Sequence, residues 1–506
     1  MTIEYDHIVV GAGSAGSTLT RRLIDAGRSV LLLEAGPVDD TESIHDPTRN
    51  IELWGSPWDW AFATEPQTHA DGRRLPWPRG KTLGGSSSFN GMIYVRGIPA
   101  DYDAWAFQGA AGWGWDGVEP YFRRLEDFEG GSDGGRGTGG PQHVQRNPGA
   151  NDLVRSWVAA AQEYGLPFNE DYNSGDIFGV SYTQHTIRDH RRQSTWVSYG
   201  EAIKDDPKLT VVTGAQVNRV LFEGEMAVGV EYQVEGQVQV ARAADDIILS
   251  GGVFGSPQLL LLSGVGPADH LRSFGLRVRS DLPGVGQNLQ DHWSSPLIWE
   301  STKPVPAWAA QGLEAHFFAA TRAGLIAPDL QPIFMSFVYP LPDRPLPEHG
   351  FSAVAQLLHP FSRGEVKLRS ADPAAPLYLD PKVFSDPRDV ETLVDNLEML
   401  RDVATQPALK EWTKGEAVPG PALSSREQLR DHARATVVSG HHQIGTARMG
   451  LDALSVVDPE LRVHGVSGLR VVDASVMPTL PSGNTNGPTI MIAEKAADLI
   501  LGQVAV

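Results

Sequence analysis

The stretch YDHIVVGAGSAGSTLTRRLIDAGRSVLLLEAG, residues 5–36, decides the fold. Residues 5–10 are mostly apolar and predict a buried strand, residues 17–26 predict a helix, and residues 29–33 predict a second strand. The glycine motif GAGSAG lies between the first strand and the helix, and Glu34 follows the second strand. This order of strand, G-x-G-x-x-G, helix, strand and acid predicts a dinucleotide-binding α/β unit.

Each glycine of the motif has a physical role in such a unit. Gly11 makes the tight turn, Gly13 lets the backbone approach a pyrophosphate, and Gly16 lets the helix pack closely on the strand. The helix N-terminus offers N–H groups to phosphates, and Glu34 can accept hydrogen bonds from ribose hydroxyls. A glycine turn without a ligand is the alternative interpretation, and the motif does not distinguish FAD from NAD.

Composition limits the class of protein. The chain has 506 residues, a formal net charge of −20 and no cysteine. The charge argues against nucleic-acid binding, and the absence of cysteine excludes disulfides and thiolate chemistry. The chain enters its first strand within five residues and has no apolar run long enough to span a bilayer. We therefore expect a cytoplasmic protein without a membrane partner; its oligomeric state is not encoded in any motif.

Three further glycine-rich segments support different interpretations. The loop GKTLGGSSSFNG at residues 80–91 suggests a second phosphate or flavin contact. A further G-x-G-x-x-G at residues 112–117 has no preceding strand, so we treat it as a chance match. The glycine-rich residues 130–140 predict a flexible segment, either a lid or a linker.

The pattern predicts a two-domain molecule. Residues 209–213 and 219–232 predict an antiparallel pair or meander, and residues 294–425 predict a β-sheet domain rich in aromatic residues. Because the glycine-rich style of the N-terminus returns twice, we expect a discontinuous Rossmann-like cofactor domain from residues 1–150, 190–295 and 436–506. Residues 151–189 and 296–435 would form an α+β substrate domain with an antiparallel sheet.

Seven segments in order resemble the glucose–methanol–choline (GMC) oxidoreductases, FAD enzymes that oxidise alcohols. They are VGAGSAG with Glu34, GKTLGGSSSFN, GSPQLLLLSGVG, GVGQNLQDH, SGHHQIGTARMG, VVDASVMP and GNTNGPTIMIAEKAAD, and they span nearly the whole chain. The ending GNTNGPTIMIAEKAADLI is most similar to the choline dehydrogenase and choline oxidase-like branch.

The resemblance implies FAD as the cofactor and assigns residues to its parts. Gly11, Gly13, Ser14, Ala15 and Gly16 would hold the pyrophosphate, with Glu34 and Ala35 at the ribose; Gly84, Gly85, Ser86, Ser87, Asn90 and Gly91 would lie along the flavin and its phosphates; Val217 would contact adenine, Asp473 and Ala474 the ribityl chain, and Asn486 and Pro488 the isoalloxazine. Some members bind FAD covalently through a histidine at the position of Phe89. Phenylalanine cannot form that bond, so we predict non-covalent FAD.

The chemistry of alcohol oxidation requires a base for the hydroxyl proton, and histidine is the usual choice. The family places it in an H-x-x-G-T segment, which makes His442 the expected base. The second family position falls on Asn484, which can steer the alcohol by a hydrogen bond; Asn486 is its rival. No metal-ligand cluster is visible.

The substrate pocket is the least legible part of the sequence. We expect Trp60, His441, Phe334 and Phe337 to line it, although such aromatic residues could equally belong to the core. An uncharged aromatic or aliphatic primary alcohol ranks first and choline second, since Glu314 is a possible but unplaced carboxylate for a choline cage. The electron acceptor could be O2, with release of H2O2, or a quinone. A flavoprotein reductase linked to NAD(P) and a non-catalytic flavin-binding protein are the rival functions.

Overall fold

The computed structural model describes residues 4–308, 310–341 and 344–503. Its first sheet is parallel and has the strand order β11 (Leu209–Val212), β3 (Val30–Leu33), β2 (His7–Val10), β15 (Ile247–Leu249) and β27 (Leu469–Val471). Strands β2, β3 and β15 are buried along their whole length, as central strands of a parallel sheet covered on both faces must be. The strand–helix–strand unit predicted for residues 5–36 is confirmed.

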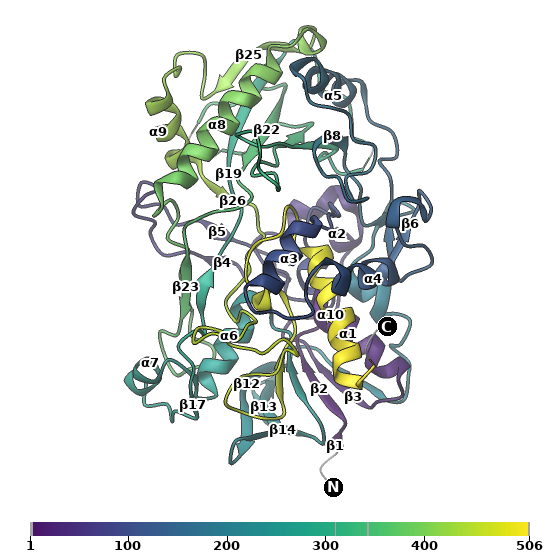
Figure 1. The fold of residues 1–506 in the computed structure, drawn as a ribbon, viewed down its shortest axis with the longest axis vertical. Helices are drawn as coiled ribbons and strands as arrows, with labels where there is room; N and C mark the ends of the chain where they lie inside the picture. Colours follow the sequence, from purple (N-terminus) through teal and green to yellow (C-terminus); the bar gives the residue numbers. More distant parts are fainter. Residues whose placement is uncertain (1–3, 309, 342–343, 504–506) are drawn as a thin grey trace.

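Two helices from opposite ends of the chain lie side by side at this sheet (Figure 1). They are α1 (Ser14–Asp25), which follows the glycine motif, and α10 (Asn486–Leu501), close to the C-terminus. Their contact is tied by Glu494, whose fully buried carboxylate accepts hydrogen bonds from Arg22 Nη2 (2.8 Å) and Arg124 Nε (2.7 Å). Segments separated by almost the whole sequence therefore meet at the predicted cofactor site.

A second, antiparallel layer lies below the parallel sheet in Figure 1. It consists of β12 (Gln216–Glu223), β13 (Met226–Val234) and β14 (Gln237–Ala243), with β1 (Glu4–Tyr5) added parallel to β14. The prediction that residues 209–213 belong to this meander was wrong. Strand β11 pairs with β3 instead and forms an edge of the parallel sheet, a choice between partners that local sequence does not encode.

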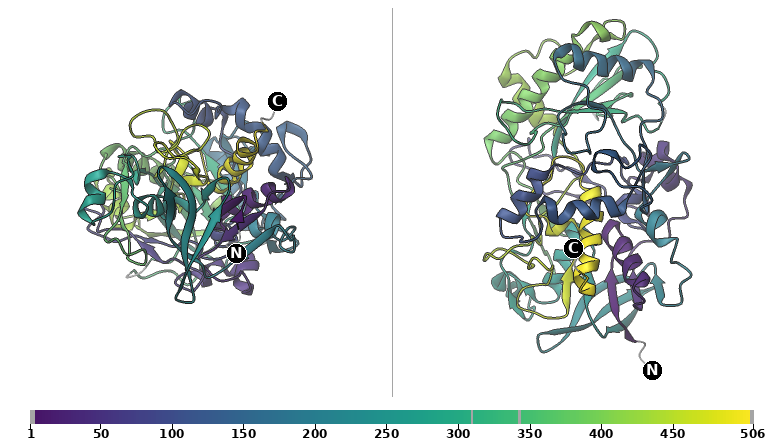
Figure 2. Two further views of the ribbon diagram at one scale, coloured as in Figure 1. Left: turned by 90° about the horizontal axis from the view of Figure 1, so that it is seen from below. Right: turned by 45° about the vertical axis from the view of Figure 1, so that its right-hand side comes forward.

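The other end of the molecule holds an antiparallel sheet (Figure 2). Its order is β25 (Thr413–Val418), β19 (Trp293–Ser301), β22 (Gly350–Gln356), β21 (Ile333–Met335), β20 (Ala315–Phe318) and β8 (Gly179–Tyr182), with β26 (Val438–Ser439) pairing to β19. Helices α5 (Asp152–Tyr164) and α8 (Pro387–Ala404) cover one face. The predicted antiparallel sheet is confirmed. The residues at which the chain passes from one domain to the other stay a prediction.

Shorter elements connect these layers. The helices are α2 (Glu42–His45), α3 (Pro99–Phe107), α4 (Trp115–Leu125), α6 (Gly252–Leu262), α7 (Ala268–Ser273) and α9 (Arg426–Thr436), and the 3₁₀ turn η2 is Gly85–Ser88; the strands are β4 (Phe62–Ala63), β5 (Pro76–Trp77), β6 (Glu126–Phe128), β7 (Gln142–Val144), β9 (Ile187–Arg188), β10 (Arg191–Arg192), β16 (Val265–Gly266), β17 (Ser280–Asp281), β18 (Gln287–Leu289), β23 (Gly364–Lys367) and β24 (Tyr378–Asp380). Among the described residues, every helix is too short or too polar to cross a bilayer.

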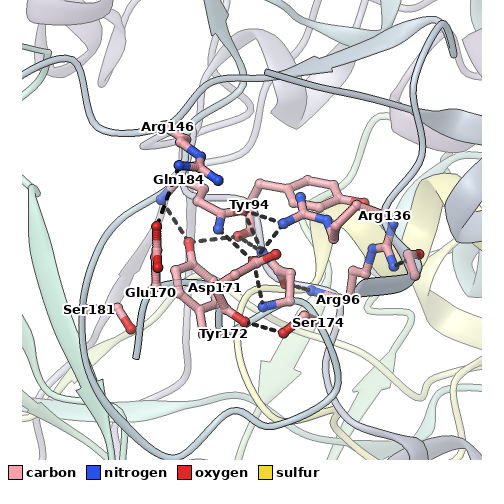
Figure 3. A network of polar contacts seen from close by, with 12 residues as sticks. Tyr94, Arg96, Arg136, Arg146, Glu170, Asp171, Tyr172, Ser174, Ser181 and Gln184 are labelled. Carbon is pink, nitrogen blue, oxygen red and sulfur yellow. Dashed lines mark hydrogen bonds and ion pairs between the residues drawn. The ribbon is translucent and has the colours of Figure 1, made fainter. Parts of the chain in front are cut away.

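The glycine-rich residues 130–140 are held by a buried polar network (Figure 3). Arg136, at the middle of the segment, donates from Nη2 to Glu126 Oε1 (2.8 Å) and from Nη1 to Gln184 Oε1 (3.0 Å). Its side chain is fully buried, and it also forms an ion pair with Asp171 at 2.6 Å. Arg136 therefore anchors the middle of this segment through long-range contacts, and the flexibility predicted from its glycine content stays a prediction for the exposed residues on either side.

Candidate active site

A cavity of about 1180 Å³ extends from the glycine motif to the second sheet. Most of the residues predicted for the cofactor and the substrate line it: Gly11, Gly13, Ser14, Ala15, Glu34, Ala35, Gly85, Ser86, Asn90, Gly91, Val217, Asp473, Ala474 and Asn486, together with His442, Asn484, Trp60, His441 and Phe337. Residues from many separate segments of the sequence thus share one space.

Two helix N-termini meet at the cavity. Neither α1 nor α10 has a side-chain cap or an acidic residue in its first turn. Ser14 Oγ, on α1, donates to Asn486 Oδ1, on α10, at 2.8 Å and joins the two ends. Uncapped N–H groups and a positive dipole end suit a pyrophosphate at α1 and an isoalloxazine at α10, so the residues present fit a flavin dinucleotide.

Glu34 lies at the end of β3 and faces the same cavity. Its carboxylate accepts hydrogen bonds from the N–H groups of Ala12 (2.9 Å) and Gly36 (2.8 Å). Burial raises the pKa of Glu34 to about 7, against the lowering effect of these two backbone donors. A ribose that donated its hydroxyls here would further favour the ionised carboxylate.

Four predicted cofactor residues do not line the cavity and act behind it. A Cβ on Gly16 would meet the carbonyl oxygen of Gly11 at 1.9 Å, so this glycine permits helix packing, as its motif role predicts. Gly84 has a positive φ of 83° and donates its N–H to the Ala12 carbonyl. Ser87 Oγ donates to the Gly84 carbonyl at 2.6 Å and closes the turn. Pro488 lies in the first turn of α10.

His442 and Asn484 are in direct contact at the cavity wall, close to the start of α10. Asn484 Nδ2 lies 3.0 Å from His442 Nε2, and His442 Nδ1 lies 2.9 Å from Nδ1 of the buried His292. With the Asn484 amide in this orientation, Nδ2 donates to Nε2, and Nδ1 then carries the proton that His292 accepts. The predicted pair is thereby brought together with a third residue that the sequence did not single out.

Asp291 holds the segment that carries His442. Its carboxylate accepts from the His442 N–H at 2.9 Å and from Gln443 Nε2 at 2.8 Å, and also from the Ser439 hydroxyl. Between these contacts His441 adopts a positive φ of 63°, which turns its ring against Trp54 at a centroid distance of 5.5 Å. The two adjacent histidines therefore face different neighbours, although both line the cavity.

Electrostatics keep His442 neutral. Burial, followed by the neighbouring His441 and the Arg79 guanidinium, lowers the pKa of His442 to about 3. Arg79 is partly buried and donates to the His441 carbonyl and to Gln443 Oε1. The imidazole of His442 is consequently unprotonated at neutral pH and has a ring nitrogen that can accept a hydrogen bond from a hydroxyl.

Of the aromatic residues predicted to line the substrate pocket, some face the cavity and one faces the core. On β21, Ile333 and Met335 line the cavity, whereas Phe334 points the other way and stacks on Trp157 of α5 at 4.7 Å. The prediction that Phe334 contacts the substrate was wrong, because side chains alternate between the two faces of a strand and the register places Phe334 in the core. Phe337 lines the cavity beside Trp308, at 5.9 Å between ring centroids.

Carboxylates are scarce along the cavity wall. Among the described lining residues they are Glu34 and Asp473, both assigned to the nucleotide, whereas Arg73, Arg74 and Arg79 supply positive charge. Glu314 is buried elsewhere and accepts from the Ala310 N–H at 3.0 Å. No group of three or more potential metal ligands occurs within the described residues.

The sequence missed several residues that contact the His–Asn pair. Asp291 and His292 were visible within the GVGQNLQDH motif but carried no assigned role. Gln331, whose Nε2 donates to Asn484 Oδ1 at 3.1 Å, follows a loop and precedes β21 without any sequence signal. Only the pairing of β21 with β22 brings it to the site.

Similarity to known proteins identifies the family of this chain. The GMC oxidoreductase family models match residues 5–294 and 360–493. Among similar proteins are the mitochondrial choline dehydrogenase of Mus musculus (40% identical, covering 99% of this chain and 90% of that protein) and an alcohol dehydrogenase [acceptor] of Pseudomonas putida (39%, covering 99% and 96%). The crystal structure of pyridoxine 4-oxidase from Mesorbium loti is 34% identical and superposes with a TM-score of 0.93 over 98% of both chains. The chain therefore belongs to the GMC oxidoreductase family and is an FAD-dependent enzyme that acts on alcohols.

Proposed function

We propose that this protein oxidises an uncharged primary alcohol to the aldehyde, with His442 as the base and O2 as the electron acceptor. The observation that carries the proposal is the contact of His442 with Asn484 at the wall of the cavity. FAD, when bound, supplies the acceptor for the hydride that leaves the alcohol carbon. Its attachment is non-covalent, since Phe89 occupies the position of the covalent histidine.

Residues of the chain would bind the alcohol, accept its proton and hold the cofactor. The alcohol oxygen would take the place of the Asn484–His442 contact, accepting a hydrogen bond from Asn484 Nδ2 and donating its proton to His442 Nε2. His292 accepts from His442 Nδ1 and fixes the ring while that proton moves. Gly11, Gly13 and the N-terminus of α1 would hold the pyrophosphate of FAD, and the N-terminus of α10 would face its isoalloxazine.

The charge of the cavity favours an uncharged substrate over choline. A quaternary ammonium is recognised by aromatic faces together with a carboxylate, and the described lining residues outside the nucleotide end include no carboxylate. Arg79, which lines the same cavity, lies near His442 and would repel a cation. The cavity wall from β21 and β22 instead presents Ile333, Met335 and Val354, which suits an aromatic or aliphatic chain.

The acceptor is proposed to be O2 because the pyridoxine 4-oxidase relative is named as an oxidase. The names of the two dehydrogenase relatives support a quinone-type acceptor as the alternative. A panel of alcohols assayed in parallel for H2O2 release and for reduction of a dye distinguishes them. Peroxide formed in stoichiometric amounts with an uncharged alcohol is the expected result; turnover only with the dye, or preferred turnover of choline, contradicts the proposal.

The base is tested by His442→Ala. We expect this variant to keep its FAD and to slow anaerobic flavin reduction by alcohol about a hundredfold to ten-thousandfold, the usual contribution of a general base. His441→Ala is the matched control, because that ring packs on Trp54 and should contribute less. Near-normal flavin reduction in the His442 variant would rule out the base assignment and favour a non-catalytic flavin protein.

A further inference from the structure

A row of buried amides continues from Asn484 into the second sheet. Ser294 Oγ, on β19, donates to Gln356 Oε1 at 3.2 Å, and Gln356 Nε2, at the end of β22, donates to Gln331 Oε1 at 2.9 Å. Gln331 Nε2 then donates to Asn484 Oδ1 at 3.1 Å, and Asn484 Nδ2 donates to His442 Nε2. Every bond in this row has the same donor-to-acceptor direction.

The direction of the row is coupled to His316 at Gln331. Gln331 Nε2 also lies 3.3 Å from Nδ1 of His316, so with the amide in this orientation Nδ1 of that buried ring accepts its second hydrogen. Flipping the Gln331 amide would place its oxygen against Asn484 Oδ1 and its nitrogen against Gln356 Nε2. Such a flip replaces hydrogen bonds with contacts between like groups, which is costly in a buried site.

The backbone holds both glutamines in place. The Gln331 N–H donates to the Gln356 carbonyl at 3.0 Å, and Asn396 Nδ2, from α8, donates to the same carbonyl at 3.2 Å. The side chains of Gln331 and Gln356 are 0% and 2% exposed. Buried amides destabilise a sheet core unless all their hydrogen-bonding groups have partners. This row of amides ends at Asn484 and His442, so the glutamines can influence that contact.

We propose that Gln331 and Gln356 are positioning residues that orient the Asn484 amide, so that its N–H faces the substrate oxygen and His442 keeps an unprotonated Nε2. The role rests on the proposed function of His442 as the base. With Asn484 reversed, its carbonyl would face the alcohol oxygen and would favour a proton on Nε2. Both changes oppose removal of the hydroxyl proton.

The test replaces Gln331 by two residues of similar length. In Gln331→Glu the ionised carboxylate cannot donate, so Asn484 should turn its N–H towards it and its oxygen towards His442. In Gln331→Met the donor is lost without this reversal. We expect anaerobic flavin reduction at saturating alcohol to slow about a hundredfold in the glutamate variant and about fivefold to tenfold in the methionine variant, the latter being the value of one hydrogen bond.

Two readouts separate orientation from a loss of packing. ¹⁵N NMR of labelled histidine, with His442 identified by its absence in His442→Ala, should show an unprotonated Nε2 in the wild type and a protonated Nε2 in Gln331→Glu. The reduction rate of Gln331→Glu should also fall as pH rises and the new carboxyl ionises, because the protonated acid can still donate. His316 faces this carboxyl, while Arg79, Asp291, His292 and His441 surround His442.

Gln311→Glu is the matched control for charge. Gln311 lines the same cavity but donates to the Leu313 carbonyl at 3.4 Å, outside the row, so the His442 tautomer should remain that of the wild type. If Gln331→Glu does not retain FAD, Gln356→Glu repeats the test one link further away, with the same tautomer change expected. A wild-type tautomer and reduction rate in whichever glutamate variant retains FAD overturns the proposal. If flavin reduction is also near normal in His442→Ala, the proposed role of His442 as the base is wrong. If flavin reduction is slow only in His442→Ala, His442 remains the base, and the proposed positioning by Gln331 and Gln356 is wrong.

Discussion

At the scale of single residues, burial changes the chemistry of two groups in opposite ways. Burial raises the pKa of Glu34 and lowers that of His442, because both side chains are pushed towards their neutral forms. A neutral imidazole is ready to accept a proton. By contrast, a carboxyl with a pKa of about 7 is only partly ionised at neutral pH, and a ligand that donates hydrogen bonds to it stabilises its ionised form.

We therefore expect FAD affinity to depend on pH. Because the ribose hydroxyls bind the ionised carboxylate best, FAD binding lowers the pKa of Glu34. By linkage, the affinity for FAD should rise as the pH increases from the lowered pKa of the complex towards 7, and it should level off above 7. The gain is about tenfold for each unit by which binding lowers the pKa. Titration of apo-protein with FAD, followed by flavin fluorescence, measures the effect. Glu34→Gln should bind FAD more weakly with a flat profile; a pH-dependent profile in this variant would assign the effect to another group.

At the scale of elements, the glycine loop before α1 and the turn η2 must touch. A Cβ placed on Gly85 would meet Gly13 Cα at 2.7 Å, and Gly85 has a positive φ of 51°. Both the contact and the backbone conformation exclude a side chain. Gly13 and Gly85, where these loops approach each other, both line the cavity.

Gly85→Ala should consequently lose FAD. The added methyl group separates the two loops and strains η2, so we expect purified protein with a much lower flavin-to-protein absorbance ratio. Gly415→Ala is the control, since Gly415 lies in β25 with no atom within 4 Å of an added Cβ and no positive φ. Full flavin content in Gly85→Ala would show that the loops can separate at no cost to binding.

Residues 130–140 are a second segment whose structure depends on contacts with distant residues. Arg136 ends a stretch that trypsin would cleave readily if it were a free linker, but its side chain is fully buried against Glu126. Native protein should resist cleavage after Arg136. Glu126→Gln leaves Arg96 and Arg136 without their shared carboxylate and should open this site to trypsin, as detected by mass spectrometry. Rapid cleavage of the wild type at Arg136 would contradict the anchored segment.

At the scale of the whole molecule, the two ends of the chain form one unit with the cofactor site. Glu494 on α10 joins Arg22 on α1, Arg124 on α4 and the hydroxyl of Tyr199 at 2.8 Å. The carboxylate is fully buried while the arginines are partly exposed. This cluster connects residues that are 472 positions apart.

Glu494→Gln should destabilise the whole molecule. Removing the charge leaves two arginines without their buried partner, and we expect a loss of about 3 kcal/mol in the free energy of unfolding. Asp25→Asn, which breaks the largely exposed pair with Arg21 on the same helix α1, should cost less than about 1 kcal/mol. Urea unfolding of both FAD-loaded variants, followed by circular dichroism, compares them; equal midpoints would contradict the role of Glu494.

The sequence by itself determined the parts that are local or carried by contiguous motifs. Residues 5–36 contain the whole strand–turn–helix–strand unit, so their glycine spacing was enough to predict the nucleotide end of the site. The motif containing His442 was likewise legible, and the structure brings it to Asn484. Tertiary structure alone decided that β11 joins the parallel sheet, that Phe334 faces α5, and that Arg136 anchors a glycine-rich segment. It also decided that His292 contacts His442, that Gln331 contacts Asn484, and that Gln356 contacts Gln331. These outcomes depend on strand register and on hydrogen bonds between distant residues, and neither leaves a periodic or local pattern in the chain.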